Sequence, residues 1–349
     1  MKLSPGSLLL AVFLSALSGY HYQFPADHFN HPDFQIEWWY YTGNLHDQSG
    51  HRYGFELTFF RQALQLPKSV DESTDPVWRP DQIFLAHLAL TDIDGYRFYH
   101  TERLNRAGPG LAGVDLNTRK YWNGNWQVYW KNLGSAQQQL QAVCDRFTLT
   151  LDLAPRKPPV IHGKDGVSRK GPAVGEASHY ISFTRLAAQG QLNGISVSGL
   201  AWMDHEFFTP QPDPTLAGWD WFAIQLENNE ELMLYRLRTK SGEISPYSSG
   251  TYIDSKGTAQ HLTADQITFA PGRVWHKYPV DWQITIPSLG LQLTERTTLD
   301  DQELSTPGSP SPSYWEGAVT YGGTIHQKPT RGAGYLEMTG YSQPMRLGH

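Results

Sequence analysis

The chain has 349 residues, a net charge of −6 and only 18% charged residues, and no basic run stands out in it. This balance argues against a binding surface for nucleic acids or anionic membranes. Aromatic residues make up 13% and include 12 Trp, enough for a large core or an aromatic-lined cavity. Cys144 is the single cysteine, so no intramolecular disulfide can form, and we interpret it as a small core residue.

The first 19 residues have the features of a signal peptide. Lys2 gives a positive start, Leu8 to Leu17 is an apolar run, and Ala16-Leu17-Ser18 is a small-x-small cleavage site. The run is short for a membrane span, and no Cys follows it to carry a lipid anchor. We therefore expect a periplasmic or secreted protein without stable membrane insertion. The alternative is that the segment is kept as an uncleaved anchor.

Short strands and turns alternate through the rest of the chain. The aromatic segment 37–43 and the segment 53–61 form a predicted hairpin, and a second hairpin turns at residues 92–95. Residues 147–153 alternate cleanly between apolar and polar side chains, as in a half-buried strand. No long stretch has the apolar period of an amphipathic helix, so we predict an all-β fold of the sandwich or barrel type.

The two halves of the chain resemble each other weakly. In each half an aromatic strand and a turn lead to an apolar strand that ends in Arg, within residues 39–61 and again within 221–238. The spacings differ by a few residues, so the similarity suggests a duplication rather than a regular repeat. We predict a domain boundary near residues 200–215 and divide the mature chain into residues 20–205 and 206–349.

Asp204, His205 and Glu206 form a run of titratable residues near the middle of the mature chain, and apolar side chains such as Met203 and Phe207 surround them. Carboxyl groups held near apolar rings have raised pKa values, which suits proton donation. If the segment is extended, Trp202, Asp204 and Glu206 share one face and His205 points to the other. The same alternation puts Glu37, Trp39 and Tyr41 on one face of the first strand.

A structural role for the acids is the alternative. They would then face water at a turn, or neutralise Arg61, Arg236 and Arg238 inside the barrels, and we prefer such pairing for Glu56 and Glu337. Other chemistries lack their motifs. The chain has 14 His but no His-Glu-x-x-His, no Gly-x-Ser-x-Gly and no phosphate-binding Gly loop. We expect no metal and no cofactor.

Seven motifs follow one another along the mature chain: Glu37-Trp38-Trp39-Tyr40, Tyr53-Gly54-Phe55, Thr58-Phe59-Phe60-Arg61, Trp202-Met203-Asp204-His205-Glu206, Gly218-Trp219-Asp220-Trp221-Phe222, Tyr314-Trp315-Glu316-Gly317 and Gly334-Tyr335-Leu336-Glu337-Met338-Thr339-Gly340-Tyr341. Together they resemble the AttH-like and carotenoid-hydratase (hydroxyneurosporene synthase) family from about residue 24 to residue 342. The resemblance implies two lipocalin-like antiparallel β-barrel domains in tandem. Members of the family include hydratases that add water to an isoprenoid double bond, relatives that catalyse pericyclic cyclisations, and exported proteins encoded with ABC transporters.

The resemblance to the hydratases implies a functional His on the strand before the central motif and an aromatic-x-Asp pair within it. These positions fall on His179, Trp202 and Asp204. Trp202 departs from the Tyr expected there, and the central Asp-His-Glu is closer to the AttH-like branch.

We therefore expect a hydrophobic, isoprenoid- or lipid-like small molecule as the ligand. In a hydratase or isomerase, Asp204 would protonate the ligand, His205 or His179 would orient it or activate water, and Glu206 and Glu37 would balance the acid. Aromatic side chains would shape the apolar site and stabilise a carbocation: Trp39, Tyr41, Trp202, Trp219, Trp221 and Trp315. The competing interpretation is a non-catalytic periplasmic carrier or accessory component of an ABC transporter, in which the acids are structural.

Overall fold

The computed structural model describes residues 20–64, 81–108, 110–173, 175–210, 215–305 and 312–344. The predicted signal peptide lies outside these residues. Nearly all regular structure in the described part is antiparallel strand, and the prediction of an all-β fold is confirmed. The helical elements there are three short 3-10 turns, η1 (Ala26–His28), η2 (Ala264–Gln266) and η3 (Pro287–Leu289). None of the helices described is long and apolar enough to cross a membrane.

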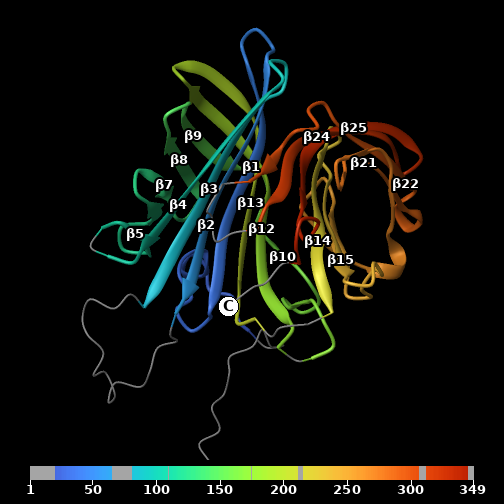
Figure 1. The fold of residues 1–349 in the computed structure, drawn as a ribbon, viewed down its shortest axis with the longest axis horizontal. Helices are drawn as coiled ribbons and strands as arrows, with labels where there is room; N and C mark the ends of the chain where they lie inside the picture. The colour runs from blue at the N-terminus through green and yellow to red at the C-terminus, as the bar shows by residue number, and fades with distance from the viewer. Residues whose placement is uncertain are drawn as a thin grey trace, which may run out of the picture.

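The strands form two large sheets that lie side by side (Figure 1). The first sheet contains β1 (Ile36–Asp47), β2 (Arg52–Ala63), β3 (Gln82–Asp92), β4 (Arg97–Arg106), β5 (Ala112–Asp115), β6 (Lys120–Asn123), β7 (Trp126–Asn132), β8 (Gln137–Val143), β9 (Thr148–Pro155), β10 (Val160–Ile161), β11 (Ser168–Arg169), β12 (Ala177–Leu192) and β13 (Ile195–Phe208). The second contains β14 (Leu216–Leu226), β15 (Glu231–Thr239), β16 (Ser249–Ile253), β17 (Ala259–Thr263), β18 (Thr268–Pro271), β21 (Asp281–Ile286), β22 (Leu291–Thr297), β23 (Glu303–Leu304), β24 (Tyr314–Ile325) and β25 (Lys328–Met338). A small separate hairpin consists of β19 (Val274–Trp275) and β20 (Tyr278–Pro279).

The two sheets share one topology. In each, the first strand pairs with the second and also with the last, so β1 lies between β2 and β13, and β14 lies between β15 and β25. The hairpins β1–β2 and β14–β15, which carry the weak sequence similarity, therefore hold equivalent places. The chain changes sheets between Phe208 and Leu216, a few residues after the expected boundary at residue 205, and the division into domains stays a prediction.

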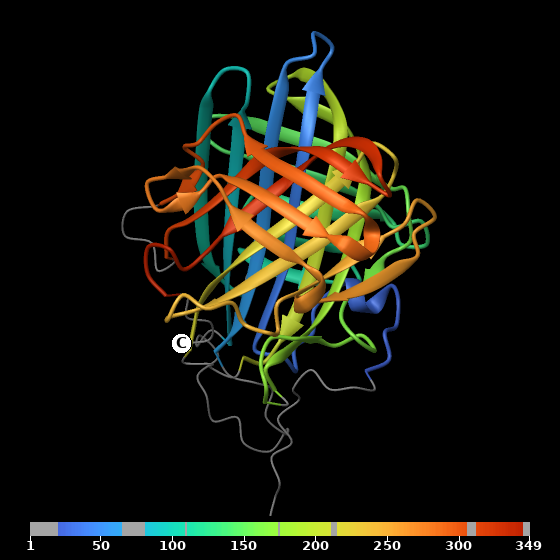
Figure 2. The ribbon, with the colours of Figure 1, turned by 90° about the vertical axis from the view of Figure 1, so that its right-hand side faces the viewer.

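Strand alternation places most of the buried apolar side chains in three layers. One layer fills the inside of the first sheet and includes Trp39, Tyr41 and Met203. A second fills the inside of the second sheet and includes Phe222 and Trp315. In Figure 2 the orange and red strands of the second sheet run across the long blue strands of the first, and the third layer lies where the two sheets meet. We call it the inter-sheet layer; its buried apolar residues are Tyr40, Ile93, Tyr180, Trp202, Trp221, Ala223, Met233, Tyr235, Leu237, Ala318 and Tyr335.

Candidate active site between the two sheets

Asp204 lies in the inter-sheet layer, where its side chain meets hydrogen-bond donors that carry no charge. Its carboxyl group accepts hydrogen bonds from the hydroxyls of Tyr180 and Ser182 and from the indole Nε1 of Trp202, the last at 2.6 Å. The pairing of β12 with β13 sets Ser182 opposite Asp204 and Tyr180 opposite Glu206. Asp204 is only 3% exposed, and no Lys or Arg of the described chain forms an ion pair with it.

Burial raises the pKa of Asp204 from 3.8 to about 7. The three hydrogen bonds act against this rise because they favour the charged form, and the charge of Glu206 adds to it. A carboxyl group with a pKa near neutrality can both donate and accept a proton at working pH. The arrangement around Asp204 therefore suits general acid–base chemistry.

Glu206 shares this face of β13 but has a cationic partner. It accepts a hydrogen bond from the Ser178 hydroxyl, and the Lys170 Nζ lies 3.4 Å from one carboxylate oxygen. Lys170 also sits 4.0 Å from the centre of the Tyr235 ring. Burial opposes the charge of Lys170, but Glu206 and Tyr235 outweigh it and raise its pKa. The two neighbouring acids of the central motif thus have different environments.

Three of the tryptophans predicted to bind the ligand meet in the inter-sheet layer. The rings of Trp202 and Trp221 pack edge to face with centroids 6.1 Å apart. The Trp221 Nε1 donates to the Tyr180 hydroxyl at 2.9 Å, and the Trp219 Nε1 donates to Glu337 at 3.1 Å. Both sheets therefore contribute aromatic rings beside the acids.

Further buried acids reach the same layer from both sheets. Burial raises the pKa of Glu337 to about 7 and that of Glu56 to about 8, and it raises the pKa of Glu316 well above its ordinary value. The preferred pairing of Glu56 and Glu337 with arginines is wrong. Among the described residues the three arginines have other partners: Arg61 pairs with Glu37, and Arg236 and Arg238 pair with Asp220.

Glu37 and His205 lie on the opposite face of the first sheet, away from Asp204. The Glu37 carboxylate accepts hydrogen bonds from His31 Nδ1 at 2.6 Å, from His205 Nε2 at 2.8 Å and from Arg61 Nε at 2.9 Å. Burial would raise the pKa of Glu37, but these partners hold it well below its usual range. His31 contacts Asp27 as well, and its pKa rises to about 9 because the two carboxylates outweigh burial.

The atoms of His31, Glu37 and His205 are close enough to hold a metal ion, since all lie within 4.8 Å of one another. Two histidines and a carboxylate form a common donor set for transition metals. However, Arg61 occupies the second Glu37 oxygen, and a His31 pKa of about 9 means that the ring carries a proton at neutral pH. Hydrogen bonds and ion pairs account for this cluster, and a metal could bind only after His31 lost its proton.

The remaining predicted site residues also lie away from Asp204. His179 is on the inner face of the first sheet, 5.1 Å from the Phe207 ring, and burial lowers its pKa to about 4. Trp39 and Tyr41 belong to the inner core of the first sheet. Trp315 belongs to that of the second, where its Nε1 donates to the Asp300 carbonyl at 2.6 Å. The structure thus brings only Glu206, Trp202, Trp219 and Trp221 of the predicted set together with Asp204.

Sequence reasoning missed Tyr180, Ser182 and Lys170. A signal for the first two exists, because Ser178, Tyr180 and Ser182 alternate along β12 as Trp202, Asp204 and Glu206 do along β13. Lys170 has no such signal, since it lies in an irregular connection after β11.

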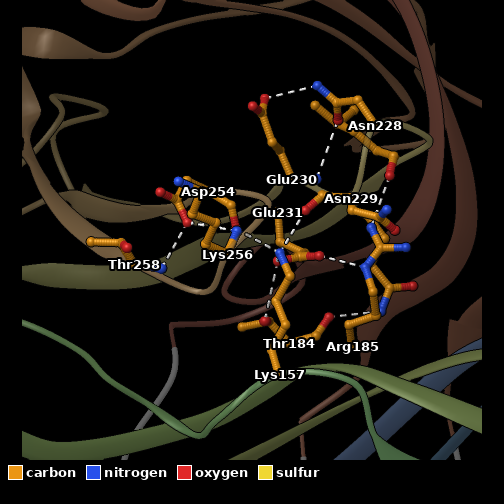
Figure 3. Close-up of polar contacts among 12 residues, drawn as sticks. Lys157, Thr184, Arg185, Asn228, Asn229, Glu230, Glu231, Asp254, Lys256 and Thr258 are labelled. Atoms are coloured by element: carbon orange, nitrogen blue, oxygen red, sulfur yellow. Dashed lines mark hydrogen bonds and ion pairs between the residues drawn. The ribbon is translucent and has the colours of Figure 1, made fainter.

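A second buried carboxylate at the junction of the two sheets has charged partners (Figure 3). Glu231, at the start of β15, pairs with Arg185 of β12 and, at 2.6 Å, with the Nζ of Lys157. Lys157 also donates to the backbone carbonyls of Asn229 and Asp254, at 2.5 and 2.7 Å. We call these residues the Glu231 junction; they tie the first sheet to the second.

Comparisons with known proteins identify the same family over nearly the whole chain. The sequence profile of the AttH-like family matches residues 15–341. The crystal structure of an AttH protein from Nitrosomonas europaea is similar, with 33% identity and a TM-score of 0.80 over 94% of this chain and 99% of that one. Kievitone hydratase from Nectria haematococca has 15% identity and a TM-score of 0.67, with 88% of this chain and 89% of that one covered.

A sequence match to a kievitone hydratase of Fusarium solani subsp. phaseoli is 40% identical over 62 residues, which is 18% of this chain and 17% of the hydratase. The structural likeness to the hydratase shows a common fold. With the family match, the prediction of an all-β, lipocalin-like antiparallel barrel fold is confirmed, while the bounds of its two domains stay a prediction.

Proposed function

The chain belongs to the AttH-like family and has the same fold as kievitone hydratase, and we propose that it is a lyase of the hydratase or isomerase type. It acts on a C=C bond of a hydrophobic, isoprenoid- or lipid-like small molecule in the inter-sheet layer, and Asp204 is its acid. One observation carries this proposal: Asp204 is buried among aromatic rings with neutral hydrogen-bond donors, and none of the described residues is a cationic partner to it.

The reaction starts with proton transfer from the Asp204 carboxyl to one carbon of the double bond. The π electrons form the new C–H bond, so positive charge develops on the other carbon and Asp204 becomes a carboxylate. The faces of Trp202, Trp219 and Trp221 stabilise this charge by cation–π attraction. Water then adds its oxygen to the cation and its surplus proton returns to Asp204. If the cation instead loses a proton from a neighbouring carbon to the Asp204 carboxylate, the electrons of that C–H bond form the new double bond and the result is isomerisation.

Two neighbours fit supporting roles in this scheme. Tyr180 holds the carboxyl of Asp204 in place and is held in turn by Trp221 from the second sheet. Lys170 neutralises Glu206, which limits the negative charge beside Asp204. Both act through Asp204 and Glu206, so we regard them as positioning residues. Export, action beside an ABC transporter and roles for Glu37, His179 and His205 stay predictions.

The test is turnover by Asp204→Asn. Purified protein is incubated with a lipid extract of the native host in oxygen-labelled water, and products that gain one labelled water, or change isomer, are identified by mass spectrometry. Removing a general acid costs about 10²–10⁴-fold, so turnover by the variant should fall at least about 10²-fold. Glu56→Gln is the matched control, because it changes another buried acid of raised pKa to an amide and should leave turnover unchanged.

Equal turnover by Asp204→Asn and the wild type would overturn the acid assignment. If the wild type retains host lipids through purification but converts none of them, the carrier interpretation replaces the lyase.

A further inference from the structure

A chain of hydrogen bonds leads from Asp204 across the junction of the sheets. Asp204 accepts from the Ser182 hydroxyl, Ser182 Oγ lies 2.7 Å from His162 Nε2, and His162 Nδ1 lies 2.8 Å from the hydroxyl of Thr251 on β16. The exposures of Ser182, His162 and Thr251 are 0%, 0% and 2%. These contacts therefore form one continuous buried path from a carboxyl group of the first sheet to a hydroxyl of the second.

The donors along this path all point toward Asp204. Ser182 has a single hydroxyl proton and gives it to the carboxylate, so its oxygen must accept from His162 Nε2–H. Burial, together with the charges of Lys170 and His261, lowers the pKa of His162 to about 3, so the ring is neutral and carries one proton. With that proton on Nε2, Nδ1 is free to accept the hydroxyl hydrogen of Thr251.

The outer end of the path is close to the edge of the second sheet. Thr251 is opposite His261 in the pairing of β16 with β17, and β17 is the edge strand of that sheet. His261 is exposed, whereas the Asp204 end of the path lies among buried rings. The path thus begins one strand from the edge of the sheet and ends at the proposed acid.

We propose that Thr251, His162 and Ser182 form a proton relay that loads Asp204 from solvent at the edge of the second sheet. In one inward pass, Ser182 gives its proton to the carboxylate and takes the Nε2 proton of His162. Nδ1 takes the hydroxyl proton of Thr251, so His162 stays neutral with its proton now on Nδ1, and Thr251 takes a proton from hydronium in the solvent, which becomes water. Each group gives and receives one proton, and the reverse sequence unloads Asp204. The inference rests on the proposed function: each hydration returns a proton to Asp204, and the relay supplies the proton with which the free acid enters its first turnover.

Charged groups beside the path affect the pKa values of His162 and Asp204, and so the rate of proton transfer can depend on pH. Lys170 and His261 act on His162, while Glu206 acts on Asp204, and Glu337 interacts with Asp204 from the second sheet. All measurements that compare variants should therefore be made at one pH, below the pKa of Asp204 of about 7.

The test follows the Asp204 carboxyl proton without a substrate. The infrared C=O band that disappears in Asp204→Asn identifies the group, and its shift after rapid transfer into heavy water gives the exchange rate. Since loss of a positioned proton-transfer group costs about 10²-fold or more, exchange should slow at least about tenfold in Ser182→Ala and Thr251→Val. A variant that merely loosened the packing would instead let water in and speed exchange.

Two variants act as controls. Thr251→Ser keeps the hydroxyl and should exchange as the wild type does. His87→Gln removes another buried His, bonded to Tyr314 across the sheets at 2.6 Å but outside the path, and should also leave the rate unchanged. Equal rates in Ser182→Ala, Thr251→Val and the wild type would overturn the relay. Turnover by Asp204→Asn equal to that of the wild type, by contrast, overturns the proposed function whatever the exchange rates are, so the two ideas fail separately.

Discussion

Asp204 and Glu231 are both buried where the two sheets meet, yet their partners differ in kind. Glu231 is 0% exposed and contacts two cations, Arg185 and Lys157. Asp204 is 3% exposed and contacts two hydroxyls and an indole, all neutral. Burial raises the pKa of both carboxyl groups, but only at Glu231 do cations oppose the shift.

The difference separates a carboxylate that joins the sheets from a carboxyl group that can react. The Glu231 junction joins Lys157, after β9, and Arg185 of β12 to Glu231 at the start of β15 (Figure 3). It therefore fixes the position of the two sheets relative to each other. The two cations at Glu231 favour its charged form and act against the rise in pKa that burial causes. The neutral donors of Asp204 orient the group without fixing its charge, which leaves the proton free to move.

The largest expected effect is on stability at the Glu231 junction. Glu231→Gln leaves the charges of Arg185 and Lys157 buried without their partner. Removing one partner of a buried ion pair costs about 3–5 kcal/mol, so the free energy of unfolding should fall by this amount in urea titrations. Glu243→Gln, at an exposed acid in the connection between β15 and β16, is the control and should change little. Wild-type stability of Glu231→Gln would mean that the junction does not hold the sheets together.

Asp204→Asn should change the free energy of unfolding in the opposite direction and by a smaller amount. At about pH 8 the wild-type carboxyl is charged in a buried site without a cation, so replacing it should raise the free energy of unfolding by roughly 0–2 kcal/mol. Thermal melts of this variant beside Glu231→Gln give the comparison directly. A loss of about 3–5 kcal/mol instead would mean that Asp204 is a structural acid like Glu231, and would favour the carrier interpretation.

Much of the fold could be predicted from the sequence because strand signals are local. Aromatic segments bounded by turns identify β1 and β2, and period-two alternation correctly puts Trp202, Asp204 and Glu206 on one face of β13. The same alternation correctly separates His205 from them. The residues that pack on each face of a strand come from distant parts of the chain. The sequence alone therefore could not test the expected grouping of Glu37 and His205 with Asp204.

A single irregularity decides which residue of β12 lies opposite Asp204. Asn193 and Gly194 form the turn between β12 and β13, so Leu192 pairs with Ile195. If the pairing continued regularly from this turn, Phe183 would lie opposite Asp204. The register shifts between Phe183 and Leu186, which moves Ser182 into that place. A β-bulge leaves no clear mark in the sequence. Arg185, which pairs with Glu231, lies within this bulge, so the irregularity adjoins both carboxyl groups.

The titration of Asp204 should make the stability of the protein depend on pH, and this moderate effect also distinguishes Asp204 from Glu231. The pKa of Asp204 is about 7 in the folded protein and 3.8 in the unfolded chain, so between these values the folded state binds more protons. Its contribution to stability is complete below pH 3.8 and is lost as the pH rises to about 7, by at most about 1.4 kcal/mol per unit. Asp204→Asn removes this contribution, while Glu56 and Glu337 act in both proteins.

The measured quantity is the difference in the free energy of unfolding between the wild type and Asp204→Asn, from urea titrations across this range. The difference should move in favour of the variant as the pH rises and become constant above the pKa of Asp204. A difference that does not change with pH would show that Asp204 is charged throughout, as a carboxylate paired with cations is.

The smallest expected effect comes from removing one hydroxyl at each carboxyl group. Tyr180→Phe takes away one of the three donors of Asp204, which should cost about 1 kcal/mol and raise the pKa of Asp204 further, because that hydrogen bond favours the charged form. Thr184→Val takes away a contact to Glu231 that is 3.5 Å long and lies beside two cations. Its effect should be within about 0.5 kcal/mol, because the ion pairs remain. Infrared titration of the Asp204 C=O band and urea unfolding measure the pKa and the stability. If Tyr180→Phe left the pKa of Asp204 unchanged, the neutral donors would not control the acid, and the distinction between the two carboxyl groups would rest on the cations of Glu231 alone.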